Sequence, residues 1–151
     1  ELAESATELA DVARALQLAQ ARFPDRLAVL PSAHASALDS AYRDPERCFR
    51  VLALLAMFGG HDGTFADVLT KALGHAAEWK PKDSPQTIAK FGGQRTWTSV
   101  EGQRKLYSRH VTLGGSVSPQ RCLQVYYDVL SDGRVEVAWV GEHRPTVGKD
   151  T

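Results

Sequence analysis

Two runs of alternating apolar and polar residues, joined by a short turn, place the strongest constraint on this chain. They cover residues 121–130 and 134–144, with a Ser-Asp-Gly turn between them. Alternation with period two is typical of strands that bury one face, and Gly133 can adopt the positive φ that a tight hairpin needs. The pattern therefore predicts a β-hairpin. Its expected core face comprises Leu123, Val125, Tyr127, Val129, Val135, Val137 and Trp139.

The composition is that of a globular domain. The chain has 151 residues, of which 43% are hydrophobic and 24% are charged. A chain of this length can bury a core of its own. We expect a single domain over residues 1–151, with a helical half at 1–80 and a strand-rich half at 94–146.

The first residue is Glu1, and no basic segment followed by an apolar run suggests a secretion signal. We therefore expect a cytoplasmic domain that forms the C-terminal part of a larger protein. No apolar run approaches about 18 residues, so no membrane partner is predicted. The spacing of Cys48 and Cys122 resembles neither a disulfide framework nor a zinc site, and both are expected to be buried thiols.

Three helices are predicted in the first half. Apolar residues recur at helical spacing through residues 2–22, which contain no Gly or Pro. Asp44 can cap a second helix over 45–58 that has Pro45 at its first position. The sequence Thr64-Phe-Ala-Asp67 resembles a capping box and predicts a third helix that ends at Gly74.

Strands dominate the remainder. Residues 27–30 suggest a short buried strand, while 32–42 fit a helix or a loop equally well. The Lys, Pro, Ser and Gly residues of 81–93 predict a loop. Residues 95–100 and 105–113 predict a first hairpin before the second one described above. The expected fold class is α+β, with about three N-terminal helices packed on a four-stranded antiparallel β-meander.

Charge is distributed unevenly, although the net charge is zero. Residues 1–78 hold 7 Lys and Arg against 11 Asp and Glu, and residues 79–151 hold 11 against 7. Between Lys80 and Arg121 there are 8 basic residues and 2 acidic ones. This bias predicts an anion-binding surface. The residues expected to bind phosphate are Arg104, Lys105, Arg109, Arg121 and Arg144.

Two histidines are candidates for acid and base catalysis. Strand parity places His110 on the polar sheet face beside Gln124 and Tyr126, and His143 follows the last predicted strand. Imidazole titrates near neutral pH, and a pair can exchange a proton across a scissile phosphate. Tyr126 could stack on a base. The alternative is that these are ordinary strand and strand-end side chains, and no metal or cofactor is predicted.

The second hairpin resembles the closing strands of RelE/ParE-like toxins. The matching stretches are Arg121 to Tyr126 and Val140-Gly-Glu-His-Arg144, within a region of about 95–146. Glu142 separates glycine from histidine, which are adjacent in that family. The pattern His-x-x-x-Gly, Pro-x-Arg-Cys-Leu-x-x-Tyr, Val-Gly-x-His is also similar to C-terminal domains of uncharacterised actinobacterial multidomain proteins.

The toxin resemblance implies a metal-independent endoribonuclease that cleaves RNA through its own 2′-hydroxyl. It would place Arg121, Tyr126, His143 and Arg144 at the site, whereas His110 comes from strand parity alone. We therefore expect an RNA-binding, RNA-directed effector domain. The alternative is a non-catalytic protein-interaction module that contacts upstream domains or another protein through the hairpin or through helix 2–22, by way of Leu2, Leu9, Val12 and Leu16.

Overall fold

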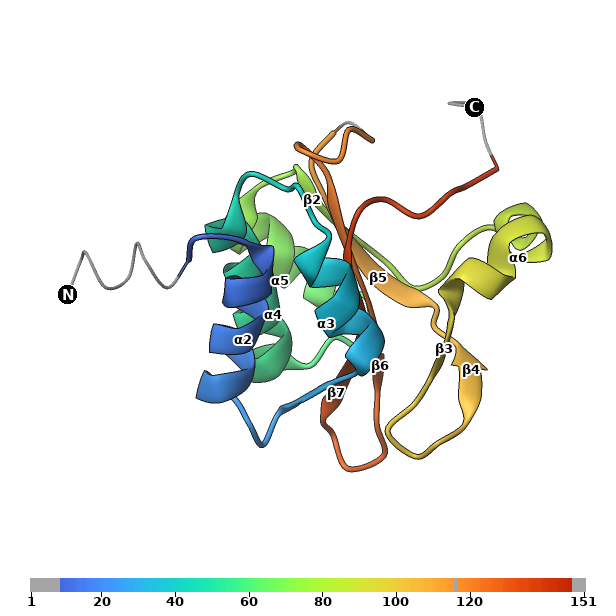
Figure 1. The fold of residues 1–151 in the computed structure, drawn as a ribbon, viewed down its shortest axis with the longest axis horizontal. Helices are drawn as coiled ribbons and strands as arrows, with labels where there is room; N and C mark the ends of the chain where they lie inside the picture. The colour runs from blue at the N-terminus through green and yellow to red at the C-terminus, as the bar shows by residue number, and fades with distance from the viewer. Residues whose placement is uncertain (1–8, 116, 148–151) are drawn as a thin grey trace.

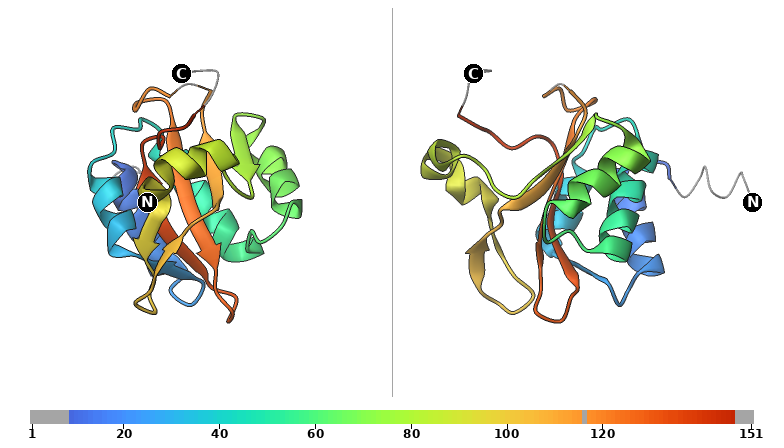
Figure 2. Two further views of the ribbon diagram at one scale, coloured as in Figure 1. Left: turned by 90° about the vertical axis from the view of Figure 1, so that its right-hand side faces the viewer. Right: turned by 180° about the vertical axis from the view of Figure 1, so that it is seen from behind.

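A computed structural model describes residues 9–115 and 117–147 of the chain. These residues form five α-helices, a mixed five-stranded sheet and a separate two-stranded hairpin, which confirms the α+β class. Figures 1 and 2 show that α2 to α5 cover one face of the sheet, and that α6 and the hairpin stand on the other. The helices are α2 (Val12–Arg22), α3 (Pro31–Leu38), α4 (Pro45–Phe58), α5 (Thr64–Leu73) and α6 (Pro85–Phe91). The strands are β1 (Leu27–Val29), β2 (Ala77–Lys80), β3 (Thr96–Thr98), β4 (Arg104–Leu106), β5 (Arg109–Leu113), β6 (Leu123–Val129) and β7 (Val135–Gly141).

Side-chain caps determine where the predicted helices begin. The Asp44 carboxylate accepts a hydrogen bond from the Arg47 backbone N–H at 3.2 Å, so α4 begins as predicted. In α5 the predicted capping box is wrong, because Thr64 is already helical. Asp62 instead accepts from the Thr64 N–H at 3.0 Å.

The first helix is shorter than predicted. Asp11 accepts from the Arg14 N–H at 2.8 Å and caps α2, so residues 9–11 form a turn and bend rather than helix. Residues 1–8 of the predicted helix, Leu2 included, lie outside the described residues. Val12 and Leu16 are fully buried within the domain's own core. The predicted contact of these two residues with another chain is therefore wrong.

The segment that fitted either helix or loop is helical. Pro31 starts α3, whose small residues Ala33 and Ala37 are buried against β7. Ser36 accepts from the Val140 N–H at 2.9 Å, which holds the helix close to the sheet. The preceding strand β1 is the predicted short strand, and it pairs in parallel with β7.

The strand order is β1-β7-β6-β5-β2, so the predicted four-stranded antiparallel meander is only partly correct. Strands β5, β6 and β7 follow one another antiparallel, including the predicted second hairpin. The predicted strand 105–113 divides into β4 and β5, because Tyr107 is buried and donates its hydroxyl to Glu136 of β7 at 2.6 Å. This contact folds the β3–β4 hairpin over the sheet instead of leaving it as the sheet's edge.

The predicted loop at 81–93 contains a helix, and the strand before it was missed. Ser84 accepts from the Thr87 N–H at 3.1 Å, and Pro85 opens α6, as Asp44 and Pro45 do in α4. A 3₁₀ turn at Gly92–Arg95 then leads into β3. Strand β2 pairs antiparallel with β5 at the sheet edge.

A β-bulge redirects one tryptophan. Tyr126 pairs with Trp139 whereas Tyr127 pairs with Val137, so Ala138 is an extra residue in β7. The bulge moves Trp139 from its predicted core face to the opposite face, where it stacks on Trp97 with ring centroids 5.8 Å apart.

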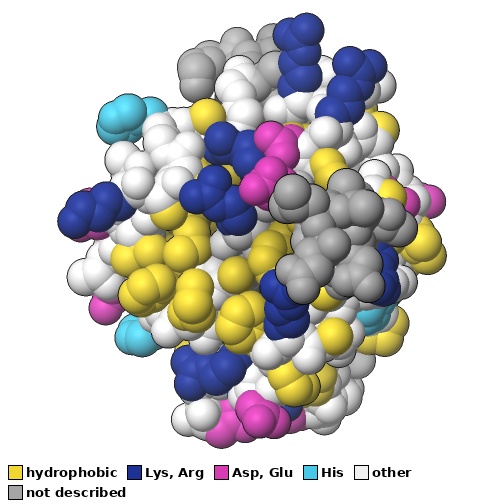
Figure 3. Space-filling view, turned by 90° about the vertical axis from the view of Figure 1, so that its left-hand side faces the viewer, with side chains coloured by type: hydrophobic (Ala, Val, Ile, Leu, Met, Phe, Trp, Pro, Cys, Tyr) yellow, Lys and Arg dark blue, Asp and Glu magenta, His cyan; other side chains and the backbone are white. Residues whose placement is uncertain are grey.

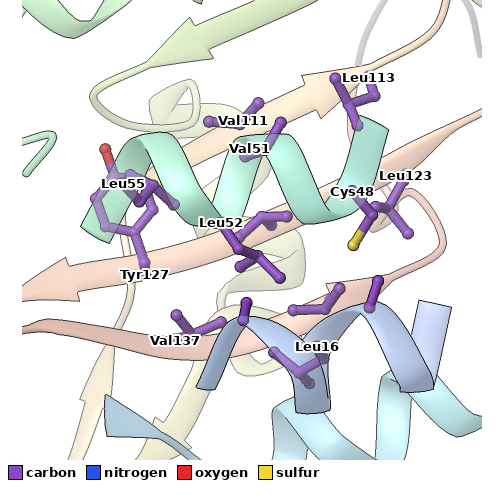
Figure 4. Close-up of a cluster of buried hydrophobic side chains, with 14 of the residues drawn as sticks. Leu16, Cys48, Val51, Leu52, Leu55, Val111, Leu113, Leu123, Tyr127 and Val137 are labelled. Atoms are coloured by element: carbon purple, nitrogen blue, oxygen red, sulfur yellow. The ribbon is translucent and has the colours of Figure 1, made fainter. Parts of the chain in front are cut away.

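Each face of the sheet carries a buried hydrophobic core. The larger core lies between the helices and the sheet, where Leu52 of α4 and Leu16 of α2 face the strands (Figure 4). The smaller core lies under the β3–β4 hairpin and comprises Leu30, Tyr107, Tyr126, Ala138, Trp97 and Trp139. The hairpin therefore covers part of the sheet face predicted to be polar, and the rest of that face keeps its polar side chains. Within the described ranges, no helix is long and apolar enough to cross a membrane.

Candidate functional site

A polar cleft of about 310 Å³ opens on the sheet face opposite α2 to α5. Side chains of the sheet form its floor, and α6 and the C-terminal segment, residues 142–147, form its sides. The lining residues are Glu78 and Lys80 of β2, Lys82, Asp83, Ser84 and Thr87 of the loop and α6, His110, Thr112 and Gln124 of β5 and β6, and His143, Thr146 and Val147 of the C-terminal segment. Two histidines and two lysines thus share one cleft.

His110 is held in one tautomer. Its side chain is 3% exposed and stacks on Tyr126, with ring centroids 4.5 Å apart. Nδ1 lies 2.9 Å from the Ser108 carbonyl oxygen, and because a carbonyl only accepts, Nδ1 carries the proton. Burial lowers the pKa of His110 below its usual 6.5. The neutral ring therefore presents Nε2 as a proton acceptor at neutral pH.

The Asp83 carboxylate contacts Arg95, Tyr126 and His110 at the cleft. One carboxylate oxygen accepts from Arg95 Nε at 2.9 Å, and the Tyr126 hydroxyl donates to the same oxygen at 3.1 Å. The other oxygen lies 3.9 Å from His110 Nε2. Burial, together with this carboxylate, raises the pKa of Tyr126, so the phenol stays protonated.

Two backbone N–H groups of the C-terminal segment donate to side chains of β6 and α6 and hold the segment across the sheet. The Arg144 N–H donates to Gln124 Oε1 at 2.6 Å, and the Val147 N–H donates to Thr87 Oγ1 at 3.1 Å. The Arg144 guanidinium lies on the Trp139 ring, 3.9 Å from its centroid. These contacts hold His143 at the cleft.

The predicted catalytic residues lie together. His110 and His143 both line the cleft, and Tyr126 lies beneath His110, fully buried. Tyr126 is therefore not accessible for stacking on a base.

The predicted phosphate-binding residues are scattered, and none of them lines the cleft. Lys105 and Arg109 pair with Asp128 at 3.0 and 2.9 Å. Arg104 is exposed on the hairpin and Arg121 is exposed after β5, while Arg144 lies beside Trp139.

Four residues near the cleft were not singled out from the sequence: Lys80, Lys82, Asp83 and Arg95. Lys80, Lys82 and Arg95 contributed to the basic bias after residue 79, and the position of Lys80, Lys82 and Asp83 just before the Ser84-Pro85 helix start was the available signal for those three. Among the residues that the structure describes, no group of three or more His, Cys, Asp or Glu could hold a metal ion. Cys48 and Cys122 are buried thiols.

Comparison with protein-family models, with curated proteins and with solved structures returned no match for this chain.

Proposed function

We propose that the cleft binds RNA and that the chain is an RNA-directed effector domain, a metal-independent endoribonuclease of the RelE-like type. The observation that supports this best is the shared lining of His110, His143, Lys80 and Lys82. Lysines attract the phosphate backbone, and a histidine pair suits proton transfer at a phosphodiester.

In the proposed reaction, His110 Nε2 removes the proton of a ribose 2′-hydroxyl. The 2′-oxygen forms a bond to the adjacent phosphorus, and the bond from phosphorus to the 5′-oxygen breaks. Protonated His143 donates a proton to that leaving oxygen. The products are a 2′,3′-cyclic phosphate and a 5′-hydroxyl end, so atoms and charge balance. The Nδ1–H of His110 is fixed on Ser108, which leaves Nε2 to act as the base.

Replacing His143 tests the catalytic assignment. His143→Ala should lower RNA cleavage by about 100- to 10,000-fold, the usual contribution of a general acid or base. Cleavage is measured on labelled single-stranded RNA with EDTA present. His75→Ala is the matched control, since His75 is exposed at the end of α5 and lies outside the cleft. Wild-type cleavage by His143→Ala would reject the assignment, as would loss of cleavage on adding EDTA.

The second candidate is a non-catalytic protein-interaction module. Met57 and Phe58 at the end of α4 are 56% and 58% exposed. Figure 3 shows hydrophobic side chains gathered on the outer face of the helices. Exposed apolar groups of this kind are typical of protein contacts. An RNA-binding experiment distinguishes the two functions: an RNA-directed domain must bind RNA, whereas a protein-interaction module need not.

A further inference from the structure

A hollow of about 380 Å³ lies between the start of α3 and the β3–β4 hairpin, on residues that do not line the cleft. We call it the hairpin hollow. Its walls are largely apolar, with Leu30, Pro31, Trp97 and Val100 among the lining residues. Small-molecule sites of roughly 300–1,000 Å³ combine such walls with a few polar groups that orient the ligand. The hairpin hollow has this size and this kind of lining.

Trp97 supplies an aromatic wall that is held in place by its neighbours. Its ring stacks on Trp139 with centroids 5.8 Å apart, and it meets Tyr107 edge-on with centroids 5.7 Å apart. These contacts define the plane of the indole without any ligand. An aromatic wall with a defined plane suits stacking by a flat ring.

The backbone of Thr98 offers one donor and one acceptor at the hairpin hollow. In the hairpin, the Ser99 N–H donates to the Gln103 carbonyl at 2.8 Å. The Tyr107 N–H donates to the Arg95 carbonyl, also at 2.8 Å. Odd-numbered residues of this segment therefore face β4, and Thr98 faces away from it. No residue that the structure describes forms a hydrogen bond with the Thr98 N–H or C=O.

The neighbouring positions on this strand edge are occupied. The Thr96 carbonyl accepts from Arg104 Nη2 at 3.2 Å, and the Val100 N–H donates to Glu136 at 2.8 Å. A peptide that adds to a sheet edge needs a donor and an acceptor at every second residue. A single donor–acceptor pair at Thr98 matches instead one edge of a planar heterocycle, such as a nucleobase.

Arg104 adds a positive charge to the hairpin hollow. Of the described residues that line the hollow, it alone is charged, and its bond to the Thr96 carbonyl holds the guanidinium towards β3. Across the part of the chain that the structure describes, no carboxylate forms an ion pair with it. A guanidinium binds phosphate through parallel N–H donors, so an anionic ligand complements this charge.

We propose that the hairpin hollow binds a free adenine nucleotide, with the base against Trp97 and the phosphate on Arg104. The Thr98 N–H donates to the ring nitrogen beside the amino group, and the amino group donates to the Thr98 carbonyl. Guanine, cytosine and uracil each carry a further exocyclic carbonyl or amino group, whose burial against apolar walls costs free energy. A single lining cation suits one phosphate better than a strand, which presents a phosphate at every nucleotide.

Titration of the full chain with adenosine 5′-monophosphate at constant ionic strength, followed by calorimetry, tests this proposal. Adenosine, which lacks the phosphate, and guanosine 5′-monophosphate should each bind about tenfold more weakly. Arg104→Gln should weaken binding of the monophosphate to the level of adenosine and leave adenosine binding unchanged. Lys82→Gln, which removes a cation from the cleft, should alter neither affinity, because the two sites share no lining residue.

Thr98→Pro tests the backbone contact, since it removes one N–H that points away from the ladder, a position where strands tolerate proline. It should weaken nucleotide binding about tenfold, whereas Thr98→Ala keeps the N–H and should bind like the wild type. If Thr98→Pro fails to fold, Arg104→Gln decides.

Absence of binding by the wild type, or equal Kd values for the wild type and Arg104→Gln, overturns the proposal. Weaker binding by Lys82→Gln would place the nucleotide in the cleft and also overturn it. A 2′-O-methylated oligoadenylate that competes with the mononucleotide and binds more tightly would overturn the assignment to a free nucleotide. None of these measurements depends on RNA cleavage, so a failure here is distinguishable from a failure of the proposed function.

Discussion

At the scale of single residues, His110 couples the stability of the fold to pH. Its pKa in the folded protein is lowered from 6.5 by burial, so the unfolded chain takes up a proton at a higher pH than the folded chain does. The free energy of unfolding is therefore unaffected by this group well above pH 6.5, and it decreases as the pH falls from about 6.5 towards the folded pKa. The slope is at most about 1.4 kcal/mol per pH unit.

Urea unfolding at about pH 7.5 and about pH 5.5 tests this coupling. The wild type should lose more stability between the two conditions than His110→Asn does, while His75→Asn should behave like the wild type. Equal losses in the wild type and His110→Asn would show that other groups account for the pH dependence.

Gly114 is a second residue whose role follows from geometry. Its φ is +95°, and a Cβ atom there would lie 2.0 Å from the Arg121 carbonyl oxygen. Gly114→Ala should therefore destabilise the protein by about 2 kcal/mol or more, measured by urea unfolding. Gly115→Ala is the matched control, because a Cβ at Gly115 meets open space. A Gly114→Ala variant as stable as this control would contradict the close packing of the two segments.

Strand parity predicted which residues share a sheet face, but not what covers that face. His110, Gln124 and Tyr126 do lie opposite the main core, as their alternation indicated. Their burial could not be predicted, since it depends on contacts distant in the sequence: Tyr126 lies in the core under the β3–β4 hairpin, and Gln124 accepts from the Arg144 N–H. The role of Arg95 was equally hidden, because one basic residue in a basic segment carries no local signal.

At the scale of secondary-structure elements, Glu136 attaches the β3–β4 hairpin to the sheet. Its fully buried carboxylate accepts from the Tyr107 hydroxyl at 2.6 Å and from the Val100 N–H at 2.8 Å, and it pairs with Lys105 at 3.1 Å. Burial and the Glu136 carboxylate raise the pKa of Tyr107, so its hydroxyl remains a donor. Three contacts from one hairpin thus converge on one carboxylate.

Removing the tyrosine hydroxyl tests this attachment. Tyr107→Phe should lower the free energy of unfolding by about 1–3 kcal/mol, because it leaves part of a buried carboxylate unsatisfied. Glu101→Gln, at an exposed turn position of the same hairpin, serves as the control. In a double-mutant cycle, Tyr107→Phe and Glu136→Gln should not be additive. Additive effects would mean that the two side chains do not act together.

Elements with a local start signal were predictable, and elements defined by distant partners were not. The start of α4 could be read from Asp44-Pro45, and Ser84-Pro85 offered the same signal for α6 in a segment interpreted as a loop. The parallel pairing of β1 with β7 joins Leu27 to Val135 across most of the chain. No periodicity within either strand specifies such a pairing.

At the scale of the whole molecule, the sheet separates two surfaces of different character. Figure 2 shows α2 to α5 on one side and α6 and the β3–β4 hairpin on the other. The cleft lies on this second side. The basic excess after residue 79 is partly compensated, since Lys105 and Arg109 pair with Asp128. Lys80 and Lys82 line the cleft instead, so RNA binding should depend on them more than on the hairpin cations.

The salt dependence of RNA binding tests that difference. Replacing Lys80 and Lys82 together by Gln should lower the log–log salt slope by about 1.4, since each lost phosphate contact contributes about 0.7 for a single strand. Replacing Lys105 and Arg109 by Gln should lower the salt slope less. Replacing Arg14 and Lys71, which lie on the helical side, should leave the salt slope unaltered. Binding of labelled RNA is measured by anisotropy at two ionic strengths. Equal salt slopes for all three double variants would place RNA outside the cleft. Phosphate contacts are strongest in dilute salt, so no RNA binding by the wild type at about 50 mM salt would favour the protein-interaction module.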